Sequence, residues 1–242
     1  MKNQIPKVAI IIPAYNESEN VKTLLKEIRR NINSKIILVD DSSNNLTKNI
    51  LIKEKITYIK RNKKSGRGSA VIRGIKESLN NKNIDLFIEM DADLSHNPSE
   101  LNRNIKFFLE KKLDVLIASR YIKKSKIVNW PMSRKILSRI SNFLVKALLR
   151  MPYSDYTNGY RIYSRKAATK VVKECGKIGD GFILLSEILM VLHNNNFKIA
   201  EIHTIFVNRI RGESSVNISL IIDSLAGLIK LFLIKNSIKK YH

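Results

Sequence analysis

The sequence has one cysteine, Cys175, among its 242 residues, so no disulfide can form within the chain. That scarcity is typical of proteins kept in a reducing compartment. A spanning helix needs about 18 uncharged apolar residues in a row. The nearest such run, residues 218–234, is interrupted by Asp223 and Lys230, so we expect no spanning helix. The apolar run near the N-terminus ends at Pro13 without the cleavage pattern of a secretory signal peptide.

Acidic residues are scarce beside basic ones. The chain has 44 Lys and Arg against 21 Asp and Glu, which gives a formal net charge of +23 and a pI near 10.1. This excess predicts an anionic partner: nucleic acid, an anionic membrane surface or a phosphorylated substrate. The alternative explanation of this positive charge is a genome rich in Lys, Asn and Ile codons, which raises the charge without a functional reason. The basic residues are spread along the chain without interleaved aromatics, which argues against a nucleic-acid stacking platform.

Apolar runs and helix-period segments alternate regularly through the first 121 residues. This alternation is typical of an α/β fold with a mainly parallel central sheet and helices on both faces. A helix is also expected after Ser42 or Ser43. The expected strands are 8–15, 35–41, 56–61, 85–93 and 114–121, and the expected helices are 18–30, 69–79 and 98–112.

The second half of the chain has a different pattern. We expect helices over 132–150 and 182–195, strands over 160–164 and 198–207, and a last amphipathic helix over 217–236. No repeat, low-complexity tract or linker interrupts the chain, which predicts one domain over residues 1–242.

Polar residues follow four of the expected parallel strands at the point where each strand ends. In open parallel sheets, ligands bind beyond the carboxyl ends of the strands, so these side chains are expected to gather along one edge. They are Tyr15, Asn16 and Glu17; Asp40 and Asp41; Asp91 and Asp93; and Ser119 and Arg120.

The pair Asp91 and Asp93 follows a strongly apolar strand. Alternate residues of an extended chain point the same way, so the two carboxylates face one spot and repel each other unless a cation lies between them. Oxygen ligands of this kind favour Mg²⁺ or Mn²⁺. The alternative is a solvated turn in which Asp93 caps the next helix.

Three further motifs have a functional interpretation and a simpler one. Asp41 in DDSS could hold a ribose or base edge, or could cap a helix. The basic, glycine-containing segment 63–74 could face an anion at a helix N-terminus, although it is neither of the usual phosphate-loop patterns. Arg134 and Ser138 lie four residues apart on one helix face and could form an anion cradle with Arg120, or a solvated basic surface.

The chain resembles the family 2 glycosyltransferases of the GT-A fold in its ordered motifs IIPAYNESENV, ILVDDSS, GRGSAVIRG, MDADLSHNP and ASRY. The motifs WPMSRKILSR, DYTNGYRIYS, GFILLSEIL and FVNRIRGES are similar to those of polyprenyl-phosphate sugar synthases, and in particular of the dolichyl- or polyprenyl-phosphate mannose synthases. The resemblance extends from about Val8 to Leu233.

The resemblance implies a role for each matching position. The nucleotide-binding segment is Pro13, Tyr15 and Glu17, and the base and ribose segment is Val39 and Asp41. The metal and diphosphate motif is Asp91, Ala92 and Asp93, with Ser95 as a further metal ligand. The residues implied to bind the acceptor phosphate are Arg120, Arg134 and Ser138, and the residue implied to face the donor diphosphate is Arg209. The residues expected to act in catalysis are Asp93, Arg120 and Arg134.

Three positions depart from the family pattern. Ser215 lies in the substrate-binding segment where relatives usually carry a diphosphate-binding lysine, and Ile183 lies where some carry a lysine. The pair Asn158 and Gly159 replaces the usual Ser-Gly. These departures leave the reaction class standing but weaken the assignment of the sugar donor.

The function implied is inverting transfer of mannose from GDP-mannose to a polyprenyl or dolichyl monophosphate, with Mg²⁺ or Mn²⁺. Residues 1–121 form the nucleotide-sugar half and residues 122–242 the acceptor half. The resemblance also implies a peripheral enzyme at the cytoplasmic face of a membrane, with or without a small anchor protein. The alternatives are another donor such as UDP-glucose or UDP-GlcNAc, a glycan acceptor or, from another class, a basic nucleic-acid-binding protein.

Overall fold

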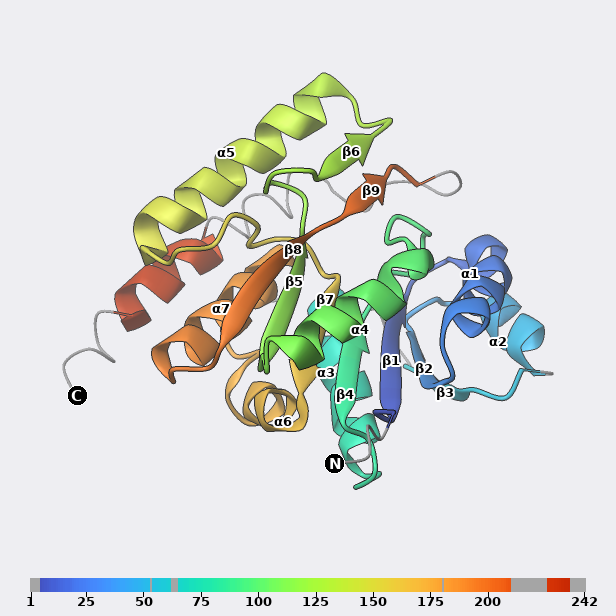
Figure 1. Ribbon diagram of the computed structural model, residues 1–242. Helices are drawn as coiled ribbons and strands as arrows, with labels where there is room; N and C mark the ends of the chain where they lie inside the picture. The colour runs from blue at the N-terminus through green and yellow to red at the C-terminus, as the bar shows by residue number, and fades with distance from the viewer. Residues whose placement is uncertain (1–4, 53, 62–64, 180, 210–225, 236–242) are drawn as a thin grey trace.

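A seven-stranded sheet runs through the computed structural model, which describes residues 5–52, 54–61, 65–179, 181–209 and 226–235 (Figure 1). In spatial order its strands are β3 (Thr57–Lys60), β2 (Ser34–Asp40), β1 (Val8–Ala14), β4 (Leu86–Glu89), β7 (Arg161–Ser164), β5 (Val115–Ser119) and β8 (Ile199–His203). β7 runs antiparallel to both its neighbours, β4 and β5, and the other pairs are parallel. The predicted α/β fold with a mainly parallel sheet is therefore confirmed.

Helices cover both faces of the sheet. One face packs against α3 (Arg67–Leu79), α6 (Arg165–Glu174) and α7 (Phe182–Asn194), and the other against α1 (Ser18–Asn31), α2 (Leu46–Leu51) and α4 (Leu101–Glu110). Strand β1 supplies both cores by alternation, since Ala9 and Ile11 belong to the first and Ile10 and Ile12 to the second. α6 ends at Glu174, directly before the buried Cys175, a position whose sequence context VVKECGK is typical of a helix.

Gly74 lets α3 lie close against β1. A Cβ atom built at Gly74 would lie 2.4 Å from Cγ2 of Ile11 and 3.3 Å from Cγ2 of Val39, both fully buried. Helix and strand would have to separate to admit even a methyl group there.

We expect Gly74→Ala to lower the free energy of unfolding by about 1–3 kcal/mol, because overpacking a filled core forces the backbone to shift. Urea denaturation measures this value. An exposed helical glycine behaves in the opposite way, because alanine favours the helix by about 1 kcal/mol. Stabilisation by Gly74→Ala would therefore contradict the close approach.

The segment 198–207, predicted as one strand, forms two. β8 ends at His203, and β9 (Ile205–Val207) leaves the main sheet to pair with β6 (Lys126–Val128). The chain turns at Thr204, where the buried carboxylate of Glu100 accepts hydrogen bonds from the Thr204 hydroxyl (2.5 Å) and the Ile205 N–H (3.0 Å). The single-strand prediction was wrong because this anchor lies on another element, the short 3-10 turn Pro98–Glu100.

A long helix, α5 (Met132–Leu149), crosses the top of the molecule, and residues 226–235 form a helix beside its C-terminal end (Figure 1). Leu228 and Leu231 of that last helix are buried in the core, and Lys235 donates a hydrogen bond to the Leu149 carbonyl. A C-terminal helix is thus confirmed over 226–235, and the rest of the predicted range lies outside the described residues. Among the helices that the structure describes, none combines the length and hydropathy needed to cross a bilayer.

Candidate active site

The predicted strand-end residues gather along the edge formed by the carboxyl ends of β1, β2, β4 and β5, below the N-terminal end of α5 (Figure 1). Pro13 and Val39 are paired in the neighbouring strands β1 and β2, and both are buried near the carboxyl ends of these strands. Tyr15 is 40% exposed just beyond β1. The convergence predicted from strand order is found.

The two acids after β2 are already bound within the protein. Asp40 is fully buried and accepts hydrogen bonds from the Tyr58 hydroxyl (2.8 Å) and the Ser42 N–H (2.9 Å). Asp41 forms a two-pronged ion pair with Arg61. One oxygen of Asp41 also accepts the N–H groups of residues 65 (3.0 Å) and 66 (3.1 Å), directly before α3. Asp41 therefore fixes the start of α3, and Arg61 lies beside it at the proposed nucleoside position.

Asp91 is held by an arginine from the first turn of α3. Nε and Nη2 of Arg67 donate to Oδ1 of Asp91 at 2.8 and 2.6 Å, and Nη1 donates to Oε1 of Glu89 at 2.6 Å. Burial alone would raise the pKa of Asp91, but the charge and hydrogen bonds of Arg67 hold that pKa below its ordinary value. The acid is therefore ionised at neutral pH.

His96 fixes the backbone of the same residue. Its Nδ1 accepts the Asp91 N–H at 3.0 Å, so Nε2 carries the proton and donates to Oδ1 of Asn158 at 2.9 Å. The ring is 1% exposed and stacks on Tyr160 with centroids 5.2 Å apart. His96 and Asn158 thus tie the end of β4 to the loop before β7.

Asp93 faces a second arginine. Nη2 of Arg209 lies 3.0 Å from Oδ2 of Asp93, and Nη1 lies 3.7 Å from Glu17. Oδ1 of Asp93 accepts the Ser95 N–H at 3.1 Å. Burial raises the pKa of Glu17, and the negative charges of Asp93 and Asp91 act in the same direction. Glu17, Asp93 and Arg209 therefore share one electrostatic environment, with Ala92 buried between the two aspartates.

The oxygen atoms here fit a divalent metal. Ser95 is 2% exposed and its hydroxyl oxygen is buried without a hydrogen-bond partner, while Oδ2 of Asp91 accepts no hydrogen bond from the described residues. No cluster of three or more His, Cys, Asp or Glu suited to a metal occurs in the described ranges. Mg²⁺ typically takes one or two carboxylates and completes its coordination with water and substrate phosphates. Asp91, Asp93 and Ser95 suit a metal held in that way.

Arg120 is buried in a strong ion pair. Its Nε and Nη2 donate to the two oxygens of Asp155 at 2.8 and 2.7 Å, its N–H donates to the same carboxylate at 2.9 Å, and Nη2 also reaches Thr157 at 2.7 Å. Arg120 is 7% exposed and Asp155 is fully buried. Among the described residues Nη1 of Arg120 donates no hydrogen bond, so an anion at this arginine would meet a guanidinium that Nε and Nη2 already anchor.

Arg134 lies at the N-terminal end of α5 above an aromatic cluster. Its guanidinium carbon is 4.3 Å from the ring centre of Trp130, on which Arg120 also lies at 5.5 Å, and Nη1 donates to Asn208 at 3.0 Å. Burial lowers the pKa of Arg134, and the positive charges of Arg209 and Arg120 act in the same direction. Arg134 therefore lies close enough to both Arg209 and Arg120 to be repelled by each of them, which favours an anion beside Arg134.

The remaining predicted residues divide into three cases. Ser138 lies one turn along α5 from Arg134 and accepts a hydrogen bond from the Tyr121 hydroxyl at 2.6 Å, which joins α5 to the loop after β5. Ile183 is 3% exposed in the core and lies against Gly227, so this position belongs to packing. Ser215 lies outside the described residues.

Sequence reasoning assigned no role to five residues that this site contains: Arg61, Arg67, His96, Asp155 and Asn158. Their partners lie on other strands and loops, so spacing along the chain carries no signal of the pairing. The one usable signal is Arg67, since an arginine that opens a helix at the carboxyl end of a sheet is placed to meet the strand-end acids.

Residues 9–172 match the family described as Glycosyl transferase family 2. Among curated proteins, the chain is 33% identical over 236 residues to a dolichol-phosphate mannosyltransferase of Pyrococcus furiosus, covering 93% of this chain but only 63% of that longer protein. It is 29% identical to a polyprenol monophosphomannose synthase of Mycolicibacterium smegmatis, covering 87% of this chain and 81% of the relative. It is also 30% identical to an undecaprenyl-phosphate mannosyltransferase of Micrococcus luteus, covering 87% and 88%.

Among solved structures, the chain is similar to glucosyl-3-phosphoglycerate synthase of Mycobacterium tuberculosis in complex with Mn²⁺, UDP and glucosyl-3-phosphoglycerate. The TM-score is 0.69 at 15% identity, with 95% of this chain and 80% of that chain covered. The same enzyme with Mg²⁺ and UDP gives a TM-score of 0.63 at 14% identity, covering 89% and 74%. At this identity the likeness establishes the fold.

Proposed function

The chain belongs to glycosyl transferase family 2, and from that premise we propose that it transfers mannose from a nucleoside diphosphate sugar to a polyprenyl monophosphate. Three curated relatives at 29–33% identity carry names for this activity. The observation that carries the proposal is the meeting of two acids, Asp91 and Asp93, with three arginines, Arg120, Arg134 and Arg209, at one sheet edge. Such a site suits a reaction between two phosphorylated substrates.

The reaction needs little proton chemistry from the protein. An oxygen of the acceptor phosphate bonds to the anomeric carbon while the bond from that carbon to the diphosphate oxygen breaks. The nucleoside diphosphate leaves with the electron pair, and the anomeric configuration inverts. Because the second ionisation of a phosphate monoester has a pKa near 6, the nucleophile is already charged at neutral pH. No general base is required, in keeping with the role of His96 as a hydrogen-bonded neutral ring.

The donor is assigned to the edge formed by β1, β2 and β4. Tyr15, Glu17 and Asp41 border the nucleoside, and Arg209 lies beside Asp93, where the diphosphate belongs. A divalent metal bound by Asp91, Asp93 and Ser95 would supply Lewis-acid neutralisation of the leaving diphosphate. Support for this cation comes from the all-oxygen ligand set and from structures of the same fold solved with Mn²⁺ or Mg²⁺.

The acceptor phosphate is assigned to the side of α5. Arg134 and Arg120 fix its negative charge next to the donor, and Ser138 with Tyr121 borders the same place. Bringing two anions together is the main task of the protein here, and planar guanidinium groups suit that task because they bind phosphate oxygens in pairs. In this assignment residues 1–121 form the donor half and residues 122–242 the acceptor half.

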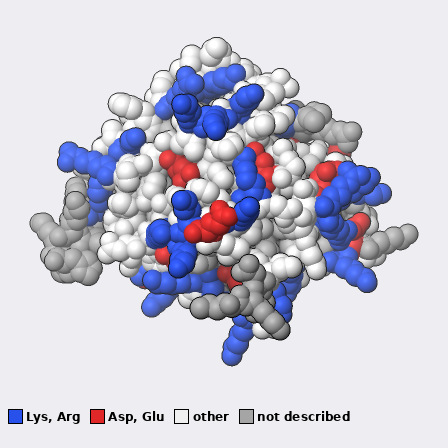
Figure 2. Space-filling view, in the orientation of Figure 1, with Lys and Arg blue, Asp and Glu red and all other residues white. Residues whose placement is uncertain are grey.

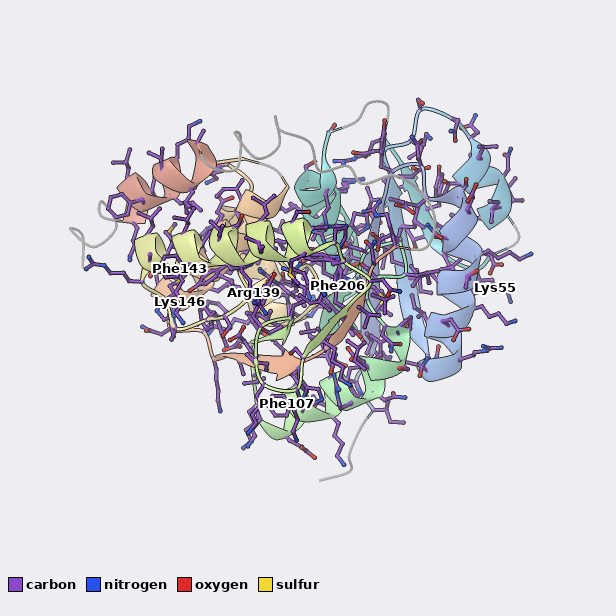
Figure 3. All side chains as sticks on the ribbon, turned by 90° about the horizontal axis from the view of Figure 1, so that it is seen from above. Lys55, Phe107, Arg139, Phe143, Lys146 and Phe206 are labelled. Atoms are coloured by element: carbon purple, nitrogen blue, oxygen red, sulfur yellow. The ribbon has the colours of Figure 1, made fainter. Side chains whose placement is uncertain are left out.

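The outer face of α5 supports a lipid acceptor. Its exposed apolar side chains form a helical stripe that includes Ile136 (51% exposed), Ile140 (50%) and Phe143 (70%). Arg139 and Lys146 lie beside Phe143 along this helix (Figure 3). Figure 2 shows Lys and Arg gathered where α5 and β6 lie. An apolar stripe with basic flanks suits the interface of an anionic membrane.

We therefore propose peripheral contact through this α5 stripe at the cytoplasmic face of a membrane. In the helix 226–235, Ile229 and Leu233 are 59% and 60% exposed, so that helix extends the apolar surface on one side and packs into the core on the other. We also propose that a small anchor protein can help to attach the chain to the membrane.

We expect the double substitution Ile140→Asp/Phe143→Asp to weaken binding to vesicles of anionic phospholipid by about tenfold or more. Each apolar side chain contributes about 1.5–3 kcal/mol when it is fully removed from water, and the new charges oppose insertion. Sedimentation with vesicles measures the bound fraction.

The matched control is Leu109→Asp on α4, which alters an exposed apolar residue (45% exposed) outside the stripe. This variant should bind as the unaltered chain does, and raising the salt concentration should weaken both. Equal binding by the double variant and the unaltered chain would remove α5 from the contact.

A panel of substrates tests the proposed reaction. GDP-mannose, UDP-glucose and UDP-GlcNAc are each supplied with polyprenyl phosphate and, separately, with a soluble glycan. Mannose on polyprenyl phosphate is the expected product. Transfer only to the glycan would overturn the lipid acceptor, and transfer only from a UDP-sugar would overturn the mannose donor. No transfer together with tight RNA binding would overturn the enzyme assignment itself.

A further inference from the structure

We propose that Arg67 is a positioning residue that sets the carboxylate of Asp91 for the metal and donor diphosphate, and that Gly159 provides the space in which Arg67 works. The inference rests on the proposed function and adds to it a part for two residues outside the metal and diphosphate motif. Both come from segments whose sequence suggests something else. Arg67 belongs to a basic, glycine-containing loop that favours phosphate, and Gly159 to a loop far along the chain.

The bonds of Arg67 leave one oxygen of Asp91 available. Both Nε (2.8 Å) and Nη2 (2.6 Å) donate to Oδ1, so the carboxylate cannot rotate without losing two charged hydrogen bonds. Oδ2 accepts none from the described residues and lies 3.7 Å from Nε2 of His96. The main chain is fixed as well, because the Asp91 N–H donates to His96.

Arg67 is itself fixed from behind by a buried acid. Its Nη1 donates to Oε1 of Glu89 at 2.6 Å, and Oε2 of Glu89 accepts from the Tyr163 hydroxyl at 3.0 Å. Glu89 and Tyr163 are both fully buried. A continuous series of hydrogen bonds therefore runs from Tyr163 in β7 through Glu89 and Arg67 to Asp91, so β7 and α3 both determine where this acid lies.

Gly159 lies directly against the guanidinium. A Cβ atom at this position would be 1.8 Å from Nη2 and 2.7 Å from Cζ of Arg67, and 3.0 Å from Oε1 of Glu89. A methyl group and the bound guanidinium cannot occupy this space together. Because the colliding atoms form the end of a long side chain, Gly159→Ala displaces Arg67 from Asp91 and leaves the backbone in place.

Charge and position make opposite predictions for metal binding. If Arg67 acted only through its positive charge, removing it would strengthen the binding of a cation at Asp91. If Arg67 acts by position, removing it frees the carboxylate and weakens binding, as the loss of residues that orient metal ligands does by about 10–100-fold. The sign of the change therefore separates the two roles.

The test is a double-mutant cycle on Arg67→Gln and Gly159→Ala. Mn²⁺ binding is measured in the presence of GDP and, separately, of UDP. The readout is the electron paramagnetic resonance signal of free Mn²⁺, which decreases as the ion binds. Each single variant should bind about tenfold more weakly or worse. The double variant should bind no more weakly than Arg67→Gln alone, because Gly159→Ala has no effect once the guanidinium is gone. Arg67→Lys should recover part of the affinity.

Two variants control for folding. Arg67→Gln/Glu89→Gln removes the carboxylate that would otherwise stay buried and unpaired, and it should fold and show the same weak Mn²⁺ binding. Arg73→Gln alters an exposed arginine on the same helix, whose ion pair is with Glu77 at 3.8 Å, and the Mn²⁺ affinity of this variant should not change. Thermal unfolding of every variant accompanies the measurement.

Several results would overturn the inference. Suppose that the unaltered chain binds Mn²⁺ with either nucleotide. The inference then fails if Arg67→Gln binds Mn²⁺ as tightly as the unaltered chain or more tightly. It also fails if the losses of Mn²⁺ affinity in the two single variants add up in the double variant. Failure of the proposed function gives a different result, in which the unaltered chain binds neither nucleotide with Mn²⁺. In that case the inference falls together with the function on which it rests.

Discussion

Asp93→Ala is expected to lower the rate of sugar transfer by about 10³-fold or more and to leave the fold intact. Asp93 is a proposed metal ligand, its Oδ2 lies 3.0 Å from Nη2 of Arg209, and its Oδ1 accepts the Ser95 N–H. Losing its carboxylate removes several kcal/mol of stabilisation from the leaving diphosphate. Asp93→Asn keeps the side-chain shape and should lose nearly as much activity.

Transfer of labelled sugar to lipid, with circular dichroism of each variant, measures this effect. The matched control is Asp85→Ala, which alters an exposed aspartate just before the opposite end of β4 whose carboxylate accepts the Lys7 N–H at 2.8 Å. That variant should retain its activity. Full activity in Asp93→Ala would remove the metal role from this residue and leave Asp91 to be tested in its place.

Arg120→Met is expected to lower the free energy of unfolding by about 3–5 kcal/mol, because it leaves the carboxylate of Asp155 buried without its partner. Asp155 is fully buried, and Arg120 donates to both of its oxygens. Arg120→Met/Asp155→Leu, which removes both charges, should recover much of the stability. Urea denaturation at pH 7 measures each value.

The stability difference between Arg120→Met and the unaltered chain should narrow as the pH falls. Burial alone would raise the pKa of Asp155, but the charge and hydrogen bonds of Arg120 hold it below its ordinary value. A carboxylate with a lowered pKa stabilises the fold above its unfolded pKa of about 3.9, and this contribution is lost as the pH falls toward the folded value. In Arg120→Met, protonation instead relieves the unpaired charge. A difference that widens in acid would contradict this account.

The ion pair of Arg120 also limits what this arginine can do at the proposed acceptor site. Arg120 lies beside Trp130, but its guanidinium is hydrogen-bonded to Asp155 and Thr157, whereas within the described part of the chain Arg134 donates a hydrogen bond only to Asn208. Arg134 is therefore the better placed of the two to bind the acceptor phosphate directly. Arg120 contributes charge from a fixed position.

The sheet edge was predictable because it follows from local pattern. Asp91 and Asp93 end an apolar strand, and parallel strands bring their carboxyl ends to one side whatever the loops between them do. The antiparallel direction of β7 was not predictable in the same way. Its sequence, RIYS, is a short strand pattern that fits either direction, and only its pairing with β4 and β5 decides the direction.

The partners of the charged residues could not be predicted. A glycine-containing basic segment at the start of a helix suggests a phosphate-binding site, yet Arg67 donates its hydrogen bonds to Glu89 and Asp91. Its guanidinium reaches them only because Gly159, from a distant loop, has no side chain. Ile183 shows the converse, because a position where a resemblance to some family members suggests lysine is here a buried isoleucine packed against Gly227.

One measurement tests the central claim most directly. The purified chain is incubated with GDP-mannose labelled in the sugar and with polyprenyl phosphate, first with Mg²⁺ or Mn²⁺ and then with excess EDTA, and label is counted in the lipid extract. The account predicts a labelled lipid phosphate sugar that forms only while free metal is present. Label that stays in the water-soluble fraction under both conditions would contradict the claim that this chain transfers mannose to a lipid phosphate.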